Sequence, residues 1–522
     1  MQNLMYTLLP FLRWFPITQD KIRADFLAGI TVALILVPQS MAYAQLAGLP
    51  VVYGLYASFV PVIIASLWGS SSQLHTGPVA MLSLMSAAAL IPFATPGSAS
   101  FIELSIMLAL MVGVLRLALG IFKLGSIVNM LSSPVIVGFT NAAALIIGLS
   151  QLSKIIGVPF PRTDSYLADL WRVVEQIPQI HISTFLFAVT AWILISGLRR
   201  VSSAIPGVLI VVVLTTLISS IIGYENKVTI DVSQIHEPET AELLERYNKT
   251  EQRIDTLITD IAELKRSALA LEKRDEQHDF EHAAKLLASA AVSDHELKIL
   301  KKDNTRRRIE IHSIIFTSAL DDKQQLMMFS GDNIPDNYQR EDGKWRFAGI
   351  KEHQIILSAG GSVVGVIPEG LPSFQVPTIQ WELVLALLPA ALVMALIGFM
   401  EATSISKAIA SSTGERVDAS KELVGQGLAN IAGSFFGSFT VSGSFSRSAV
   451  AAKIGAQTGL FAIISATAVV LVLLFFTSYL YHLPQAVLAV IVMMAVFSLI
   501  RIKPLTQAWK VDRVGAVIGI VT

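Results

Sequence analysis

Long apolar stretches alternate with short polar connections over most of the chain. Each apolar stretch is long enough to cross a lipid bilayer, either whole or as two half-stretches broken by Gly and Pro. The pattern predicts twelve spans, at 26–47, 51–68, 77–93, 103–122, 127–152, 182–198, 204–223, 381–400, 422–437, 443–456, 458–480 and 484–500. A thirteenth span begins near Val514 and is cut at Thr522, so we expect the final spans to be truncated.

A polar segment separates the seventh predicted span from the eighth. From Glu225 to about Arg346 the chain is rich in Glu, Asp, Lys, Arg and Gln. A heptad pattern within it predicts an amphipathic helix with a coiled-coil seam, formed by Ile254, Leu257, Ile261, Leu264, Ala268 and Leu271. A second helix at about 279–303 would pack antiparallel to the first, with short strands at Ile309–Phe316 and Trp345–Phe347. The alternative is a flexible charged linker.

Composition and charge placement agree with a membrane protein. Of the 522 residues 53% are hydrophobic and 15% charged, which is too apolar for a chain with one soluble core. Lys+Arg and Asp+Glu are equal at 39 each, so the charge gives no argument for nucleic acid, and the lack of Cys excludes disulfides and thiolate metal sites. Loops such as Lys407–Lys421 are basic, whereas Ala94–Ser100 and Thr477–Pro484 are nearly free of Lys and Arg. The positive-inside rule then predicts a cytoplasmic N-terminus and an outside location for the polar segment.

Two spans begin with polar, Gly-containing sequence and are short for a membrane. In the first, Thr76 is a possible cap and Pro78 stands near the first helical position, which predicts a helix start. The second starts within Thr440–Ser448, which holds several hydroxyls, a Gly and Arg447. Two half-helix N-termini at mid-membrane would present N–H donors and positive dipole ends, which favours an anion as the substrate. The alternative is two ordinary kinked spans whose Ser and Thr bond back to their own helices.

Two ionisable residues lie within or at the end of apolar spans, where burying a charge is energetically unfavourable. Arg447 would need a partner or a wet cavity, and its planar guanidinium matches oxyanions. Glu401 ends the apolar run Leu383–Met400, so it lies at or just inside the membrane. It is predicted to be a proton or cation coupling site, or the partner of Arg447; the alternative is a carboxylate that snorkels from the end of a helix.

The first span carries a polar pair on one face. Pro38 breaks the helix there, and Gln39 and Tyr43 are four residues apart, so both can donate to one ligand. Such a pair can equally well join two helices by hydrogen bonds.

Several motifs together resemble the sulfate permease (SulP) family of sulfate permeases, bicarbonate transporters and animal anion exchangers. They are Pro38–Ala44 with Tyr53–Tyr56, Thr76–Ala80, Pro134–Phe139, Ile367–Pro372, Glu401 and Gly443–Ser448. The resemblance covers nearly all of 10–522 except the polar segment. It implies an all-α integral membrane protein with a UraA-like elevator fold of two inverted seven-span repeats, in which a core domain moves against a gate domain. The family usually has a short connection in place of the polar segment and a cytoplasmic STAS domain at its end, and this sequence shows neither.

The resemblance also implies a domain division. The first repeat would occupy 1–223 with spans one to seven, and 361–522 would hold spans eight to twelve and the start of the thirteenth. Between them, 224–360 would be an extracytoplasmic helical or coiled-coil insert. The core would contain spans one to four and eight to eleven, and the gate spans five to seven and the last three. Two half-helices would meet at mid-membrane, with the anion between the third and tenth helix starts.

Carried over by position, the resemblance assigns an anion site and a coupling group. The anion would be lined by Gln39, Tyr43, Val79, Ala80, Ser446 and Arg447. Glu401 would be the coupling carboxylate. We expect no catalytic residue, metal or cofactor, and the expected partners are a small inorganic anion, protons or sodium as coupling ion, the lipid bilayer and a second copy in a homodimer, without nucleic acid.

The function implied is secondary transport of sulfate or a similar small oxyanion, driven by protons, in a bacterial inner membrane. A second transport interpretation is sodium-coupled bicarbonate uptake, and dicarboxylates, chloride and nitrate stay open as substrates. From a different class, the chain could be a non-transporting sensor or scaffold that binds a partner through the insert. An enzyme is disfavoured because no spaced His or carboxylate cluster suggests a nucleophile or a metal site.

Overall fold

The chain folds into two compact units, each described here by itself. This computed structural model describes residues 9–94, 96–123, 141–142, 145–146, 148–160, 166–201, 207–272, 277–321, 325–331, 334–335, 337–351, 354–415 and 417–497. The helical unit comprises Met1–Ile155, Leu186–Leu217 and Val364–Thr522. The mixed unit comprises Ile156–Phe185 and Ile218–Val363.

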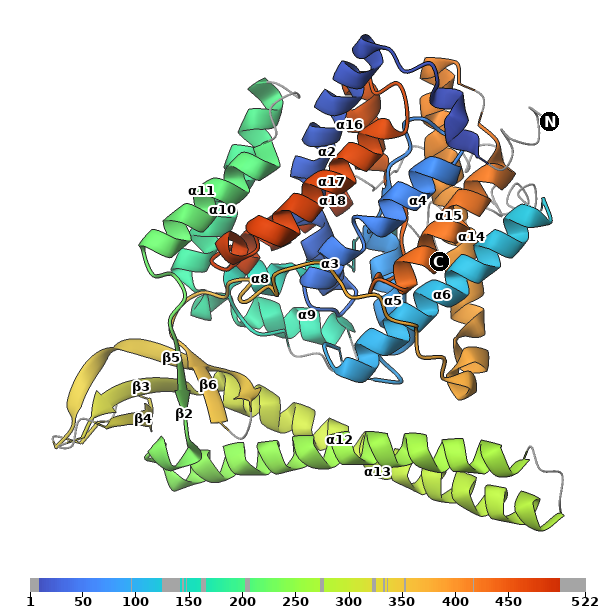
Figure 1. The fold of residues 1–522 in the computed structure, drawn as a ribbon. Coiled ribbons are helices and arrows are strands. Elements are labelled where there is room, and N and C mark those ends of the chain that lie inside the picture. The colour runs from blue at the N-terminus through green and yellow to red at the C-terminus, as the bar shows by residue number, and fades with distance from the viewer. Residues whose placement is uncertain are drawn as a thin grey trace, which may run out of the picture. The chain divides into compact units, whose positions relative to one another are not determined.

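The helical unit consists of apolar helices, several of them interrupted (Figure 1). Three helices of the described residues are long and apolar enough to cross a membrane, namely Gln19–Leu46, Ala99–Ile121 and Leu383–Ala410. Its first half contains η1 (Pro10–Trp14), α2 (Gln19–Leu46), α3 (Val52–Tyr56), α4 (Val60–Trp68), β1 (Thr76–Gly77), α5 (Ala80–Leu90), α6 (Ala99–Ile121), α8 (Leu152–Ile156), α10 (Ile182–Val201) and α11 (Gly207–Ile221). Its second half contains α14 (Trp381–Thr413), α15 (Ala419–Ser434), β7 (Ser442–Gly443), α16 (Phe445–Ile454), α17 (Leu460–Phe475), η5 (Ser478–Leu480) and α18 (Gln485–Phe497).

Glycines allow α15 to approach α6 closely. A Cβ atom added at Gly427 would lie 2.5 Å from the backbone N of Leu117, and one at Gly113 would lie 2.8 Å from the backbone N of Ile431. Helices at such short separation bury backbone against backbone, as small residues permit inside membranes. An apolar core that includes Leu82, Leu108, Val112, Leu387 and Ala395 then joins α5, α6 and α14.

Two local predictions about the helical unit are wrong. Thr76 does not cap a helix: it lies in β1, and α5 begins at Ala80 with Val79 as its N-cap residue. The break predicted at Pro38 is also wrong, because α2 continues through Pro38 to Leu46. The alternative in which Glu401 lies at a helix end is excluded, because α14 continues to Thr413 and is terminated by Gly414 in the left-handed conformation, with φ 73°. The predicted span 127–152 and the motif Pro134–Phe139 fall mostly or wholly outside the described residues, as does the thirteenth span.

The mixed unit combines a helical hairpin with an antiparallel sheet. Its elements are α9 (Tyr166–Glu175), η3 (Ile177–Gln179), β2 (Lys227–Ile230), η4 (Val232–Gln234), α12 (Pro238–Glu272), α13 (Gln277–Ser313), β3 (Ile315–Leu320), β4 (Leu326–Ser330), β5 (Gln339–Lys351) and β6 (Gln354–Ser358). The five strands follow the order β2-β6-β5-β3-β4. Leu244 of α12 and Ile311 of α13 pack on the sheet residues Phe316, Trp345 and Leu357, so the base of the hairpin shares one core with the sheet.

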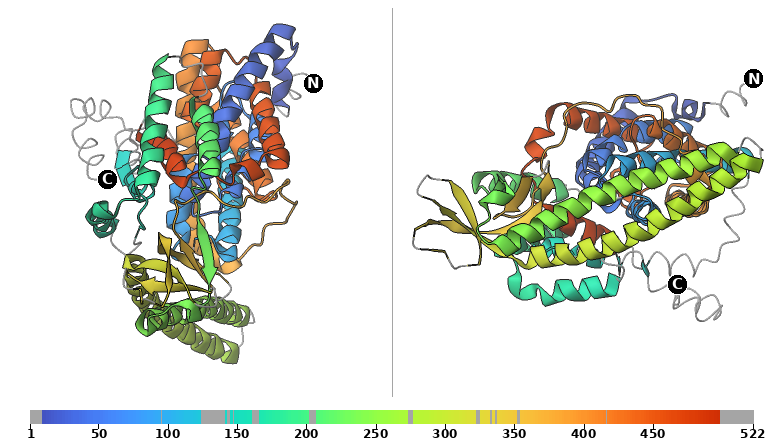
Figure 2. Two further views of the ribbon diagram at one scale, coloured as in Figure 1. Left: turned by 90° about the vertical axis from the view of Figure 1, so that its left-hand side faces the viewer. Right: turned by 90° about the horizontal axis from the view of Figure 1, so that it is seen from below.

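The heptad prediction is confirmed. The helices α12 and α13 lie side by side in Figures 1 and 2, and Ile254, Leu257, Ile261 and Leu297 form a buried cluster between them. A folded hairpin, and not a flexible linker, therefore occupies this part of the segment. The strand predicted at Ile309–Phe316 is wrong in its first half, since α13 continues to Ser313, whereas Trp345–Phe347 does lie in a strand. The sequence predicted two short strands beside the hairpin, whereas the structure has a five-stranded sheet.

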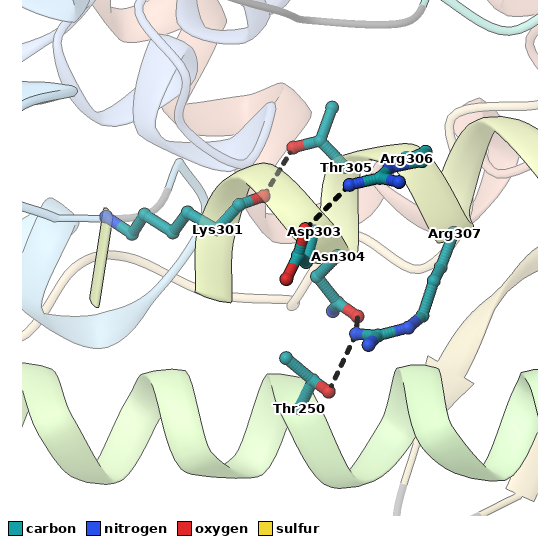
Figure 3. Close-up of polar contacts among 7 residues, drawn as sticks. All are labelled: Thr250, Lys301, Asp303, Asn304, Thr305, Arg306 and Arg307. Atoms are coloured by element: carbon teal, nitrogen blue, oxygen red, sulfur yellow. Dashed lines mark hydrogen bonds and ion pairs between the residues drawn. The ribbon is translucent and has the colours of Figure 1, made fainter. Parts of the chain in front are cut away.

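A polar residue interrupts the apolar seam of the hairpin. Asn304 is 2% exposed and donates from Nδ2 to the backbone O of Tyr247 (3.3 Å) and to Oε1 of Glu251 (2.7 Å). Figure 3 shows Arg307 reaching across to Thr250, with 3.1 Å between Nη1 and Oγ1. A buried polar residue in a seam fixes the register of two helices, because any other register would leave it without partners.

Candidate anion site

The N-termini of α5 and α16 are held side by side. The two-residue strands β1 and β7, which precede these helices, pair antiparallel with Thr76 opposite Gly443 and Gly77 opposite Ser442. The backbone N of Ser444 also donates to the backbone O of His75, at 2.9 Å. The short strands thus join segments more than 360 residues apart, and both helices begin within three residues of the pairing.

Neither helix start is capped by its own N-cap side chain. Val79 has no capping group, and the Ser444 hydroxyl makes no capping bond to α16. The first N–H groups of a helix need acceptors, and the helix dipole places positive potential there. Two adjoining helix starts therefore form a place where an anion can be bound by backbone donors.

Arg447 lies in the first turn of α16 and is fully buried. Its Nε donates to Nδ1 of His75 (3.1 Å), and its Nη2 donates to the backbone O of Pro78 (2.9 Å). Its Nη1 donates to Oε1 of Gln39 at 3.4 Å. A Cβ atom at Gly77 would lie 3.0 Å from Nη2, so the guanidinium packs tightly against this glycine. All these neighbours are neutral acceptors, so they orient Arg447 without cancelling its charge.

The predicted polar pair on α2 belongs to the same cluster. Gln39 and Tyr43 are 5% and 6% exposed, and Gln39 contacts Arg447 as described above. The uncharged phenol of Tyr43 lies within electrostatic range of the Arg447 guanidinium. Gly54 of α3 packs on the backbone of Ser40, where any side chain would collide with the carbonyl. That close contact holds the part of α2 after Pro38 against α3.

The other predicted lining residues occupy the two helix starts. Val79 and Ala80 are buried at the beginning of α5. Ser446 is exposed in the first turn of α16, with its Oγ 3.4 Å from Oγ of Ser444. The structure therefore brings Gln39, Val79, Ala80 and Arg447 together around the β1–β7 pairing, with Tyr43 and Ser446 beside them.

Glu401 lies in the interior of α14, which excludes the alternative of a carboxylate that snorkels from the end of a helix. Its Oε2 is buried and has no hydrogen-bond partner, and no ion pair among the described residues includes Glu401. The carboxylate interacts electrostatically with both Arg116 and Arg447 without a direct contact.

Other buried carboxylates of the unit are satisfied by backbone donors. Asp25 accepts from the backbone N of Gln457 (2.7 Å), and Glu422 accepts from the backbone N of Ser70 (2.9 Å). These two side chains tie loops together, as buried charges with hydrogen bonds do. Glu401 differs from them because its buried Oε2 accepts no hydrogen bond from the described residues.

Sequence reasoning missed Arg116 and His75. Arg116 lies in the apolar helix α6 and is fully buried. A charge inside an apolar span is costly, and this was a usable signal for a functional residue. His75 stands just before Thr76 and was assigned no role, yet it accepts a hydrogen bond from Arg447 and its Nε2 bonds Oγ of Ser465 at 2.9 Å.

The apolar helices and the two adjoining helix starts define a membrane protein with a candidate site for an anion. The chain belongs to the sulfate permease family, whose sequence model matches residues 22–261 and 347–522. The unmatched residues 262–346 comprise the end of α12, all of α13 and much of the sheet.

Curated relatives match almost the whole chain. It is 29% identical to "Sulfate transporter 4.1, chloroplastic" of Arabidopsis thaliana over 97% of this chain and 56% of the relative. It is 28% identical to the "Sodium-independent sulfate anion transporter" of Bos taurus over 97% of this chain and 66% of the relative. The chain thus spans little more than half to two thirds of the length of these relatives.

Solved structures share the fold. The murine solute carrier 26 family member A9 anion transporter in the inward-facing state is similar with a TM-score of 0.67 and 20% identity, over 100% of this chain and 68% of that chain. The transmembrane domain of the cyanobacterial bicarbonate transporter BicA is similar with a TM-score of 0.62 and 19% identity, over 97% of this chain and 95% of that chain.

Proposed function

We propose that this protein is a secondary transporter of sulfate or a similar small oxyanion, coupled to protons and working by an elevator movement. The observation that carries the proposal is the β1–β7 pairing, which holds two uncapped helix starts beside the buried Arg447. Backbone donors, two dipole ends and one oriented guanidinium select for negative charge. The names of the plant and bovine relatives support sulfate as the anion.

Proton coupling is proposed for Glu401 on physical grounds. A carboxylate near an anion site weakens anion binding when it is ionised and ceases to do so when it is protonated. Protonation and anion binding then favour each other, which is the linkage that a symporter requires. The unpartnered Oε2 supports this role, because no hydrogen bond holds the carboxylate in its ionised form.

The elevator proposal concerns which helices move together. The inverted repeats would occupy 1–223 and 361–522. The proposed core spans, α2 to α6 and α14 to α17, pack on one another through two apolar clusters, one around Leu82 and Leu108 and one around Phe461 and Val62. Such a packed body could carry the anion as one piece, while the remaining spans form the gate.

Sodium-coupled bicarbonate uptake is the second candidate. The similarity to the transmembrane domain of a bicarbonate transporter over 95% of that chain favours it. The same helix starts and Arg447 would bind this monovalent oxyanion, and the coupling ion would then be sodium. A sensor or scaffold that acts through the hairpin is disfavoured because buried charges such as Arg447 and Glu401 are costly to keep without transport.

Placement and assembly belong to the same proposal. We place the protein in a bacterial inner membrane with a cytoplasmic N-terminus and the 224–360 insert outside, and we infer a homodimer. The basic loop Lys407–Lys421 and the uncharged loop Ala94–Ser100 support this orientation.

An uptake panel separates the candidates. Radiolabelled sulfate, bicarbonate, succinate and chloride are offered to vesicles that contain the protein, with pH and sodium gradients imposed separately. Sulfate uptake that rises with an acid exterior and ignores sodium supports the proposal. Bicarbonate uptake that requires sodium, without sulfate uptake, would replace it with the second candidate.

A further inference from the structure

Arg116 is a second fully buried guanidinium in the helical unit. Its Nε donates to the backbone O of Ala395 (3.3 Å), and its Nη2 donates to the backbone O of Met394 (3.2 Å). Its Nη1 donates to the backbone O of Val441 (2.8 Å) and to Oε1 of Gln426 (3.3 Å). The side chain therefore joins α6 to α14, to α15 and to the segment just before β7.

Within the part of the chain that the structure describes, no carboxylate forms an ion pair with this guanidinium. All four acceptors are neutral, and none of the ion pairs among the described residues includes Arg116. A buried cation without a counter-ion is costly unless an anion visits it or a nearby charge offsets it. Glu401 is the one carboxylate found to interact electrostatically with Arg116 among the described residues, and they make no direct contact.

A short chain of contacts links Arg116 to the anion site. Gln426 accepts from Arg116 and donates from Nε2 to Oγ1 of Thr76 at 3.3 Å. Thr76 pairs with Gly443 in the β1–β7 pairing, and its neighbour Gly77 lies against Arg447. Arg116 donates to the carbonyl of Val441 and Arg447 to that of Pro78, so the two guanidiniums bond the two chain segments at the same end of the β1–β7 pairing.

We propose that Arg116 supplies a second fixed positive charge to the anion site and thereby sets its preference for divalent over monovalent anions. The inference rests on the proposed anion transport and deepens it. The other charged or titratable groups around the site are Arg447, Glu401, Tyr43 and His75.

Charge balance explains why two arginines suit a dianion. Two guanidiniums balance one sulfate when the Glu401 carboxyl is protonated. The same two guanidiniums balance a monovalent anion together with an ionised Glu401. A loaded site that is neutral crosses an apolar environment at the lowest cost, so sulfate should travel with a proton and chloride without one.

Three variants separate the charge of Arg116 from its role in packing. Arg116→Gln removes the charge and keeps an amide that can donate to the same carbonyls. Arg116→Lys keeps the charge and loses the planar fork. Gly398→Ala keeps the arginine but displaces it, because a Cβ atom at Gly398 would collide with Nη2 of Arg116.

The measurement is competition between sulfate and chloride for uptake into vesicles that contain the full chain. Thermal stabilisation of the monodisperse protein by sulfate, measured in detergent, checks that each variant is folded. A unit charge acts on two charges of sulfate and on one of chloride, so Arg116→Gln should lower the sulfate-to-chloride preference on the order of tenfold. Arg116→Lys and Gly398→Ala should lower both uptakes and leave that preference within about twofold of wild type.

Two results would overturn the inference. One is an unchanged preference in Arg116→Gln protein that is folded by the stabilisation check. The other is an equal loss of preference in Arg116→Lys, which would give Arg116 a purely structural role. A wild-type protein that takes up neither anion would instead remove the proposed function, so the two failures are distinct.

Discussion

Arg447 is the residue whose replacement tests the anion site most directly. Its guanidinium is fully buried and held by His75, Gln39 and the carbonyl of Pro78. We predict that Arg447→Ala abolishes high-affinity sulfate binding while the protein stays folded. Arg447→Lys should rescue binding only in part, because an ammonium cannot reproduce the planar fork or reach all three neighbours at once.

The expected loss of sulfate affinity in Arg447→Ala follows from the energy of hydrogen bonds to a charged group. A hydrogen bond to a charged group contributes about 1.5–3 kcal/mol net, so loss of the guanidinium should weaken sulfate binding roughly 10- to 150-fold. The same change leaves the acceptors on His75, Gln39 and Pro78 without a donor, which costs about 1–3 kcal/mol for each one that water does not reach. Some loss of thermal stability is therefore expected together with the loss of affinity.

The assay is sulfate binding to the purified full chain by titration calorimetry, with size-exclusion elution and circular dichroism as checks on folding. Lys453→Ala is the matched control, because Lys453 is also a basic residue of α16 but lies in its last turn. We expect near wild-type affinity in this control. Wild-type affinity and uptake in folded Arg447→Ala protein would refute the assignment of the site.

The remaining predictions concern coupling, the insert and pH. Glu401→Gln should abolish the acid stimulation of sulfate uptake while anion exchange at equal pH persists; acid stimulation retained in this variant would remove Glu401 from the mechanism. A chain in which Tyr224 is joined directly to Gly361 should still insert and bind sulfate, since Gly361 N already donates to Tyr224 O at 2.9 Å. Protease added to intact cells should cut within 237–346, and protection of this region until lysis would reverse the proposed topology. Burial, with a further contribution from Arg308, lowers the pKa of His312 to about 4, so the stability that the neutral imidazole provides is complete above about pH 6.5 and is lost as the pH falls towards 4. Between pH 7 and pH 5 His312 should cost the mixed unit about 1–2 kcal/mol of unfolding free energy by calorimetry, and the loss in His312→Gln should be smaller by this amount.

The sequence predicted those features that depend on neighbouring residues. The heptad positions of α12 are buried where expected, with Ile254, Leu257 and Ile261 in the hairpin core. The α5 and α16 starts were also located to within a few residues. The cap at Thr76 failed because β pairing with Gly443 took its backbone away from the helix, and a partner so distant in sequence leaves no local signal.

Features that depend on distant contacts could not be predicted from one sequence. The contact between Arg116 and Val441 joins residues 325 positions apart, and that between Arg447 and His75 joins residues 372 apart. An arginine within an apolar run signals a functional residue but does not identify its partners. For Glu401, the apolar run indicated burial, whereas the missing hydrogen bond to Oε2 is visible only in the folded chain.

Deletion of the insert would also remove two hydrogen bonds that it makes to the Ile156–Phe185 segment. The geometry of these bonds indicates that their loss costs little free energy. Arg308 donates to the backbone O of Phe160 (3.1 Å), and Arg346 donates to the backbone O of Gln179 (3.0 Å), so the insert holds the Ile156–Phe185 part of its own unit. Both bonds are partly or fully exposed, so water can replace the lost donors. Neither carbonyl belongs to the anion site. We therefore expect the shortened chain to lose order in Ile156–Phe185, seen as faster hydrogen exchange there, while sulfate affinity is retained; a loss of affinity would show that the insert takes part in the transport step.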